Sequence, residues 1–261
     1  MESSLSITRA DLLRHIGRKR GWDRDPANWD ERQHLDGDDI LSMGLRRFYS
    51  PPRLPGEPTS HRWSFLRPIH VMTTETAKGD YDLPDDFGGI DGKLYFGSDL
   101  VGNGSLTRVG EQWVLAQRQG DSGITGYPKY YATAVLPGDG DEPQRFTLML
   151  TPTPDSEYSL RFQYRVNPYN LTATKTYPLG GQPHSETLIA SCMAACDSIL
   201  GSDEPGKADA EFMALLAGSV AHDRAEMGPR NMGYSHGHGA DDGLAAPARA
   251  TRVLFQDTLW D

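Results

Sequence analysis

The stretch YSLRFQYRV, residues 158–166, alternates between apolar and polar side chains without interruption. Such a two-residue period predicts a β-strand with one buried face, here Tyr158, Leu160, Phe162, Tyr164 and Val166. The stretch RFTLML at 145–150 alternates in the same way, and TPTPDS at 151–156 has the composition of a turn. We therefore predict that the two strands form an antiparallel hairpin.

Further strands are expected on the N-terminal side of this hairpin, separated by glycine-rich turns. The candidate segments are KLYFGS (93–98), SLTRVG (105–110), EQWVLAQ (111–117) and YYATAVL (130–136). Several short strands at this spacing are typical of a small sandwich or barrel.

On the C-terminal side of these strands, the spacing of apolar residues changes to that of a helix. SETLIASCMAACDSILG (185–201) repeats apolar residues every three or four positions, and Ser185 is the expected N-cap. A second helix is predicted over 205–227, with a buried face of Phe212, Leu215, Leu216, Ser219 and Val220. A short connection predicts that the two helices pack antiparallel. The two cysteines, Cys192 and Cys196, are expected to be buried and reduced.

Two more helices are predicted near the N-terminus. Residues 7–17 (ITRADLLRHIG) offer Thr8 and Asp11 as a capping box and Gly17 as the stop. The basic cluster GRKRGW at 17–22 suits the negative end of this helix. Residues 36–52 predict the second helix, which begins near Asp38 and Asp39 and ends at two prolines.

The predicted fold is therefore α+β: a bundle of N- and C-terminal helices with an inserted antiparallel β-sandwich or barrel-like region and an extended C-terminal tail. The expected parts are N-terminal helices (1–55), a β-rich region (56–180), a C-terminal helical hairpin (181–227) that packs on the N-terminal helices, and a linker with a docking tail (228–261). The linker is rich in glycine, whereas the tail is apolar and should dock on a partner through Val253, Leu254, Phe255, Leu259 and Trp260.

The charge and composition disfavour a nucleic-acid-binding protein and a membrane or secreted protein. The net charge of −10 disfavours tight nucleic-acid binding, which needs a basic stripe to neutralise phosphates. The longest apolar run is far too short to span a membrane, and the first residues do not have the pattern of a secretory signal.

The acidic stretch YDLPDDFGGI, residues 81–90, is a candidate for metal binding or catalysis. Short carboxylates after a proline and before glycines are typical of a turn, so Pro84, Asp85, Asp86 and Phe87 are interpreted as a structural turn, with a metal or catalytic site as the alternative. His236 and His238 lie in the glycine-rich linker, where two ligands do not make a catalytic metal site. We expect no catalytic residue, cofactor or metal.

Several short sequence motifs follow one another in an order that is similar to that of a known protein family. GRKRGW, GLRRFYSPP, HRWSFLRP, YDLPDDF, GYPKYYA and PHSETLIASCMAACD follow one another over residues 5–225. This set resembles the head-to-tail adaptor (connector, head-completion) proteins of tailed bacteriophages. The resemblance implies a structural virion protein without catalytic residues, assembled in the host cytoplasm.

The resemblance also implies partners. It suggests a homo-oligomeric ring of twelve copies beneath the portal protein, with a surface for tail, stopper or tail-terminator proteins. Genomic DNA would pass through the ring without sequence-specific binding, which agrees with the acidic composition.

Two alternatives remain from the residues themselves. A carbohydrate- or receptor-binding β-module of a phage tail or baseplate would use Trp113, Tyr130 and Tyr131 as stacking platforms. A hydrolase with an unrecognised site would use His184 or His222.

Overall fold

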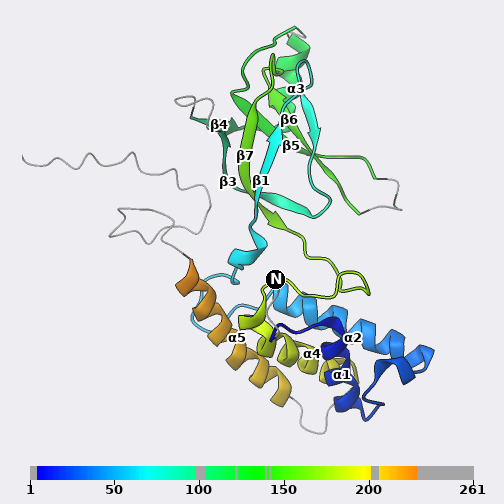
Figure 1. Cartoon of the computed structure of the whole chain (residues 1–261). Coiled ribbons are helices and arrows are strands. Elements are labelled where there is room, and N and C mark those ends of the chain that lie inside the picture. The colour runs from blue at the N-terminus through cyan, green and yellow to red at the C-terminus, as the bar shows by residue number, and fades with distance from the viewer. Residues whose placement is uncertain are drawn as a thin grey trace, which may run out of the picture. The chain divides into compact units, whose positions relative to one another are not determined.

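The computed structural model describes residues 5–97, 104–120, 123–138, 140, 143–200 and 206–227 (Figure 1). The chain divides into two compact units. The helical unit comprises residues 1–67 and 166–227, and the β unit comprises residues 68–165. Residues 56–67 and 166–180, predicted to belong to the β-rich region, thus lie in the helical unit. The predicted α+β class is confirmed.

The helical unit is built around α4, which contacts the three other long helices of the unit. Its elements are α1 (Arg9–Arg20), α2 (Glu31–Tyr49), α4 (Ser185–Leu200) and α5 (Lys207–Glu226), with short 3-10 helices at Pro26–Asn28, Ser64–Leu66 and Gln182–His184. Apolar side chains from all four helices, together with Trp29, Trp63 and Leu66, form one continuous core.

Helix α1 begins as predicted but ends later. Thr8 and Asp11 form the capping box, whereas the stop is Gly21, in the left-handed conformation (φ 68°), and not Gly17. Gly17 is buried inside the helix because Trp29 packs against it: a Cβ at this position would lie 2.6 Å from the indole ring. The last turn contains Arg18, Lys19 and Arg20, which confirms the prediction that the basic cluster lies at the negative end of the helix.

Helix α2 begins earlier than predicted. Its N-cap is Asp30, which forms a capping box with Gln33, so Asp38 and Asp39 lie within the helix. Asp38 instead accepts a hydrogen bond from the Arg9 guanidinium of α1. The polar composition of residues 31–39 concealed this first part, which has few apolar residues to show a helical period.

Helices α2 and α4 cross at very short range. A Cβ on Gly44 would lie 2.6 Å from Cys192 Sγ and 2.8 Å from Cys192 Cα, and the Ser191 hydroxyl donates to the Gly44 carbonyl at 2.6 Å. Only glycine permits this approach of the two backbones. Ser185, predicted as the N-cap of α4, already has helical dihedrals because a 3-10 turn leads directly into the helix.

Helices α4 and α5 run antiparallel, as predicted. Thr187 at the start of α4 bonds Ser219 late in α5, at 2.6 Å between the hydroxyls. At the other end of the pair, Arg47 donates to both Ser198 and Asp209. Of the predicted buried face of α5, Phe212, Leu216, Ser219 and Val220 are buried, whereas Leu215 is exposed.

The described part of the β unit is a seven-stranded mixed sheet, in the order β1-β7-β3-β4-β5-β6-β2, that curls into a half-barrel (Figure 1). Its strands are β1 (Ile69–Thr73), β2 (Asp80–Asp82), β3 (Phe87–Phe96), β4 (Ser105–Arg108), β5 (Tyr130–Val135), β6 (Phe146–Thr151) and β7 (Ser159–Val166). Strands β4 and β5 are parallel, since helix α3 (Glu111–Gly120) connects them. The expectation of an antiparallel region is therefore correct only in part.

The predicted hairpin of the two alternating segments is wrong. Strand β6 pairs with β5 and β2, whereas β7 pairs with β1 and lies next to β3 in the sheet. The segment between them, TPTPDS, contains two prolines that cannot donate to a hairpin ladder. Its carbonyls bond other loops instead: Ala77 N donates to Pro154 O and Gly126 N donates to Thr153 O.

The segment EQWVLAQ, predicted as a strand, is part of α3. Val114 is its buried residue and packs with Ala132 of β5 and Met149 of β6, while Trp113 and Leu115 remain exposed. A short apolar run does not distinguish helix from strand. None of the described helices is long and apolar enough to cross a bilayer.

Candidate functional site

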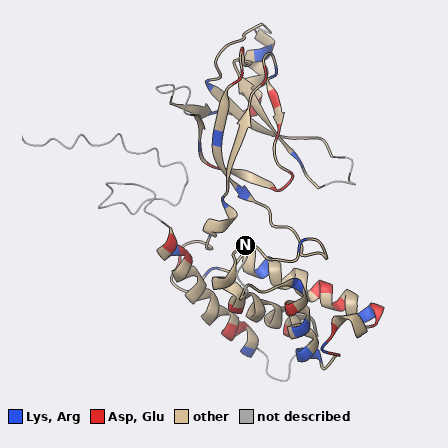
Figure 2. Ribbon diagram, in the orientation of Figure 1, with Lys and Arg blue, Asp and Glu red and all other residues tan. Residues whose placement is uncertain are grey.

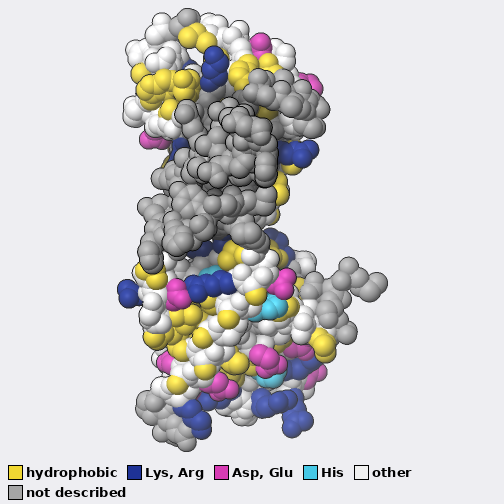
Figure 3. Space-filling view, turned by 90° about the vertical axis from the view of Figure 1, so that its left-hand side faces the viewer, with side chains coloured by type: hydrophobic (Ala, Val, Ile, Leu, Met, Phe, Trp, Pro, Cys, Tyr) yellow, Lys and Arg dark blue, Asp and Glu magenta, His cyan; other side chains and the backbone are white. Residues whose placement is uncertain are grey.

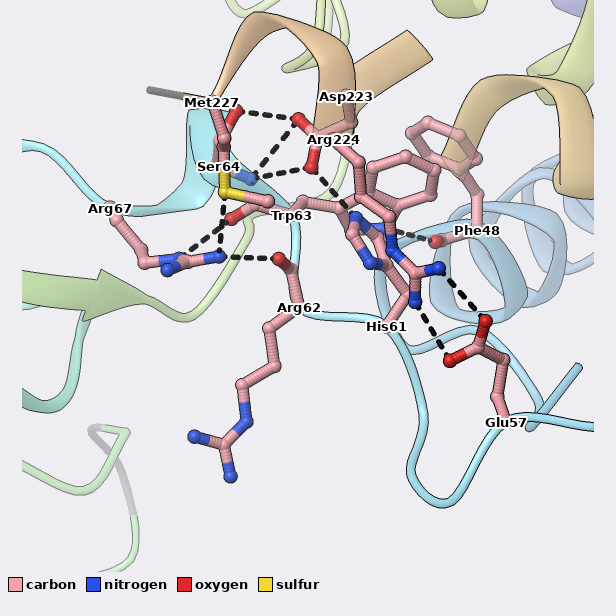
Figure 4. A network of polar contacts seen from close by, with 10 residues as sticks. All are labelled: Phe48, Glu57, His61, Arg62, Trp63, Ser64, Arg67, Asp223, Arg224 and Met227. Carbon is pink, nitrogen blue, oxygen red and sulfur yellow. Dashed lines mark hydrogen bonds and ion pairs between the residues drawn. The ribbon is translucent and has the colours of Figure 1, made fainter. Parts of the chain in front are cut away.

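A buried carboxylate organises the polar contacts at the C-terminal end of α5. Asp223 is 3% exposed, and its Oδ2 lies 2.7 Å from His61 Nε2. Ser64 donates its hydroxyl to Asp223 Oδ1 at 2.5 Å and its backbone N–H to the same carboxylate at 3.2 Å (Figure 4). One carboxylate thus satisfies three donors of the segment before β1. We call Asp223, His61, Ser64 and Arg67 the clamp.

Arg67 closes the clamp on the side where the chain leaves the helical unit. Its guanidinium donates to the carbonyls of Trp63 and Arg62, at 3.2 and 2.6 Å, and its Nη2 lies 3.6 Å from Met227 Sδ (Figure 4). Arg67 therefore ties together the last residues before the β unit and the residue that follows α5. An exposed pair, Arg224 with Glu57, adds a further bidentate contact and lowers the pKa of Glu57 through the hydrogen bond from the guanidinium.

An aromatic cluster forms the inner wall of the clamp. Trp63 is 1% exposed, donates its indole N–H to Phe48 O at 2.7 Å, and lies 4.8 Å from the Phe48 ring. His184 packs against Trp63 and Phe65, and no described residue bonds its Nδ1. Burial lowers the pKa of His184, against the attraction of Asp223, so the ring is held neutral in its apolar surroundings.

The clamp contains a serine, a histidine and an aspartate, but their contacts are not those of a catalytic triad. A Ser–His–Asp triad requires the histidine to bond the serine, but here both His61 and Ser64 bond Asp223. The arrangement therefore holds a loop, and it has no relay that would activate Ser64 as a nucleophile. Among the described residues no group of three His, Cys, Asp or Glu side chains could hold a metal ion.

Sequence reasoning missed the clamp, although one signal was present. Asp223 continues the buried stripe of α5 at helical spacing after Phe212, Leu216, Ser219 and Val220. A charged residue on an apolar stripe indicates a buried partner. The partners His61 and Ser64 lie about 160 residues away, in the short segment before β1, where no periodicity marks them.

Of the predicted turn residues, Pro84, Asp85 and Asp86 lie between β2 and β3, and Phe87 is the first residue of β3. Phe87 N donates to Pro84 O at 2.9 Å, and Phe87 is 2% exposed. Asp86 accepts a hydrogen bond from the Tyr164 hydroxyl at 3.0 Å, and burial together with this bond raises the pKa of Tyr164 to about 12. Asp85 is exposed and lies 3.5 Å from Arg145 Nε.

The three aromatic residues considered as stacking platforms are not equivalent. Trp113 on α3 and Tyr130 on β5 lie together, with ring centroids 4.8 Å apart, and Trp113 is 39% exposed. Tyr131 is buried in the β unit and cannot offer its face to a ligand.

The remaining candidates occupy different surroundings. Cys192 and Cys196 are free and buried, and burial raises the pKa of both thiols, that of Cys192 to about 12. His222 is exposed at the surface of α5, beside His184, with ring centroids 5.9 Å apart. The histidines His236 and His238 and the predicted docking residues Val253, Leu254, Phe255, Leu259 and Trp260 lie outside the described residues.

The two edges of the sheet differ in chemistry. Edge strand β2 carries Asp80 and Asp82, which pair with Arg118 at 2.9 Å and Arg145 at 3.7 Å. Edge strand β1 has the sequence IHVMT and exposes Ile69 (70%) and Val71 (52%). Charges protect an edge against further pairing, so β1 is the edge open to a partner.

Acidic and basic residues lie next to one another along both units (Figure 2), and the visible face of the helical unit shows apolar and charged side chains intermixed (Figure 3). Cross-element pairs such as Lys19 with Asp197 and Arg47 with Asp209 contribute to this mixture.

Comparison with known proteins agrees with the resemblance drawn from the ordered phrases. The SU10 adaptor protein family matches residues 7–233, most of the chain. No curated protein matches the chain significantly. The match confirms the resemblance to phage head-to-tail adaptors, and the chain belongs to the SU10 adaptor protein family.

Proposed function

We propose that this protein is a structural component of the virion, a head-to-tail adaptor that assembles as a ring of twelve copies beneath the portal. The ring continues the DNA channel and presents an attachment surface to tail or stopper proteins. The observation that carries the proposal is the family match over residues 7–233.

The geometry of the helical unit supports a rigid building block. The close crossing at Gly44 and the clamp around Asp223 fix the helices and the loop that leads out of the unit. A ring needs head-to-tail contacts between different faces of neighbouring copies, and such contacts require subunits of fixed shape.

The charge distribution supports DNA passage without tight binding. The net charge of −10 and the interspersed charges of Figure 2 oppose neutralisation of many phosphates. Low phosphate affinity lets DNA slide through a channel. We also propose that the protein has no catalytic role, since the clamp lacks a nucleophile relay.

The C-terminal segment is the proposed docking element. Its apolar residues, Phe255 and Trp260 among them, follow a glycine-rich linker, a composition suited to docking on a neighbour, the portal or the next ring.

The test is to produce particles with Phe255→Ala and Trp260→Ala together. We expect unattached heads and tails, while the purified variant keeps the circular dichroism spectrum and melting temperature of the wild type. Normal yields of stable, infectious particles would contradict the docking function.

A carbohydrate-binding role is the second candidate, supported by the exposed Trp113 and the half-buried Tyr130 that packs against it. Burial of Tyr131 leaves a platform of only two rings. A glycan-array screen separates the two functions: micromolar binding that is lost in Trp113→Ala would favour this candidate over the adaptor.

A further inference from the structure

The open edge of β1 presents both apolar side chains and backbone groups. In the antiparallel pair with β7, Tyr164 N donates to Pro68 O and Thr74 N donates to Tyr158 O. Hydrogen-bonded pairs alternate in such a ladder, so the even-numbered residues direct their backbone groups to β7. Ile69, Val71 and Thr73 direct theirs outward, where no other described strand pairs with them.

The same three residues expose their side chains. Ile69 and Val71 are 70% and 52% exposed, and Thr73 is also exposed. By contrast, the His70 ring packs inward against Phe162 and Tyr164. The edge therefore offers three outward N–H and C=O pairs, with apolar side chains, to one incoming strand. An uncharged edge without proline is a template for strand addition.

The chain itself carries a segment that fits this edge. Residues 251–256 read TRVLFQ, with Val253, Leu254 and Phe255 at the centre and neither glycine nor proline. Valine, phenylalanine and threonine favour extended structure. The segment is about as long as β1, which spans Ile69–Thr73.

The reach of the chain also favours this segment. A flexible chain as long as the linker, residues 228–250, spans about 26 Å on average. Fully extended it reaches about 75 Å, enough to arrive at a neighbouring subunit.

We propose that residues 251–256 of one copy add as a strand to the open edge of β1 in a second copy. This inference deepens the proposed function, because it names the receptor of the docking segment within the ring. Each copy then gives a strand and receives one, so every β1 edge in a closed ring is covered.

The experiment uses the full chain with Phe255→benzoylphenylalanine, a photoreactive aromatic residue, in rings assembled on portal complexes. Unlabelled variant chains are mixed with ¹⁵N-labelled wild-type chains before assembly. After irradiation, mass spectrometry identifies the cross-linked peptides, and negative-stain images of the same sample record the rings. The matched control carries the photoreactive residue at Tyr234, in the linker.

We expect the residue at position 255 to cross-link to the peptide that contains residues 69–73, in pairs of one labelled and one unlabelled chain. Val71→Lys should reduce this cross-link at least tenfold, because it places a charge on the edge. The control at position 234 should show no enrichment for this peptide.

Rings whose cross-links map to the portal or to another part of the chain would overturn the inference and leave the proposed function intact. Cross-links to residues 69–73 only within single chains would also overturn it, since the segment would then cover its own edge. Absence of rings in the images would count against the proposed function itself.

Discussion

The helical unit and the β unit use their apolar residues differently. In the helical unit a continuous core includes residues from four helices, and even a buried carboxylate is fully bonded. Both units expose some large apolar side chains, but those of the helical unit include Leu35 and Leu215 on helices, whose backbone groups are bonded within the helix, whereas Ile69 and Val71 of the β unit lie on an edge strand. We infer from this difference that the helical unit supplies rigidity and that the β unit supplies a surface for partners.

The crossing of α2 and α4 should be the most sensitive point of the rigid unit. We expect Gly44→Ala to lower the free energy of unfolding by about 3 kcal/mol, because its Cβ would overlap Cys192 backbone atoms. Urea denaturation followed by circular dichroism measures the change.

The matched control for this substitution is Gly218→Ala on α5. Nothing lies within 4 Å of its new Cβ, so alanine should stabilise the helix by about 0.5–1 kcal/mol. Equal effects of the two substitutions would show that the crossing does not depend on glycine.

Loss of the clamp should have the second largest effect on the free energy of unfolding. Asp223→Ala leaves the Ser64 N–H and His61 without their acceptor, and should lower the free energy of unfolding by about 2 kcal/mol. Hydrogen exchange should also become faster in residues 61–67. The control is Asp209→Ala on the same helix, whose exposed pair with Arg47 contributes little, so an equal loss there would contradict the importance of the clamp.

His184 should make the free energy of unfolding depend on pH, and this effect should be smaller than that of the substitutions above. Burial lowers its pKa in the folded state, so below pH 6.5 the unfolded chain binds a proton that the folded chain does not. Stability should therefore fall as the pH falls from about 6.5 toward the folded-state pKa. His184→Phe keeps an aromatic ring in the cluster and should make the unfolding free energy less dependent on pH between 7 and 5. An unchanged pH dependence would show that His184 is not the group responsible.

The smallest effect on folding is expected at the surface of the β unit. Val71→Lys should change the free energy of unfolding by less than about 0.5 kcal/mol, since Val71 is 52% exposed on an edge strand. The same substitution should strongly reduce ring assembly, measured by native mass spectrometry with portal complexes. A large loss of stability with normal assembly would reverse the contrast between the two units.

Local patterns predicted much of the helical unit. The helical period located α4 and α5, and the capping box of Thr8 and Asp11 located the start of α1. The prediction that Gly17 ends α1 is wrong because a glycine can either end a helix or make room for a neighbouring side chain. Only the position of Trp29 distinguishes the two cases.

The β unit was less predictable because much of its pairing is not local. Alternation identified β6 and β7 as strands, and β6 pairs with the preceding strand β5, but its other partner β2 and the partner β1 of β7 lie more than 60 residues away in sequence. The same limit applies to the clamp, whose carboxylate and histidine come from the two separate sequence segments of the helical unit. The contrast between the edges becomes visible only when the strand order is known.

Electron cryomicroscopy of the native particle tests the central claim most directly. We expect a closed ring of copies directly below the portal, with the helical fold unchanged in every copy and an added strand along each β1 edge. A particle in which this protein occurs as separate copies away from the portal, with β1 uncovered, would contradict both the adaptor function and the proposed use of the edge.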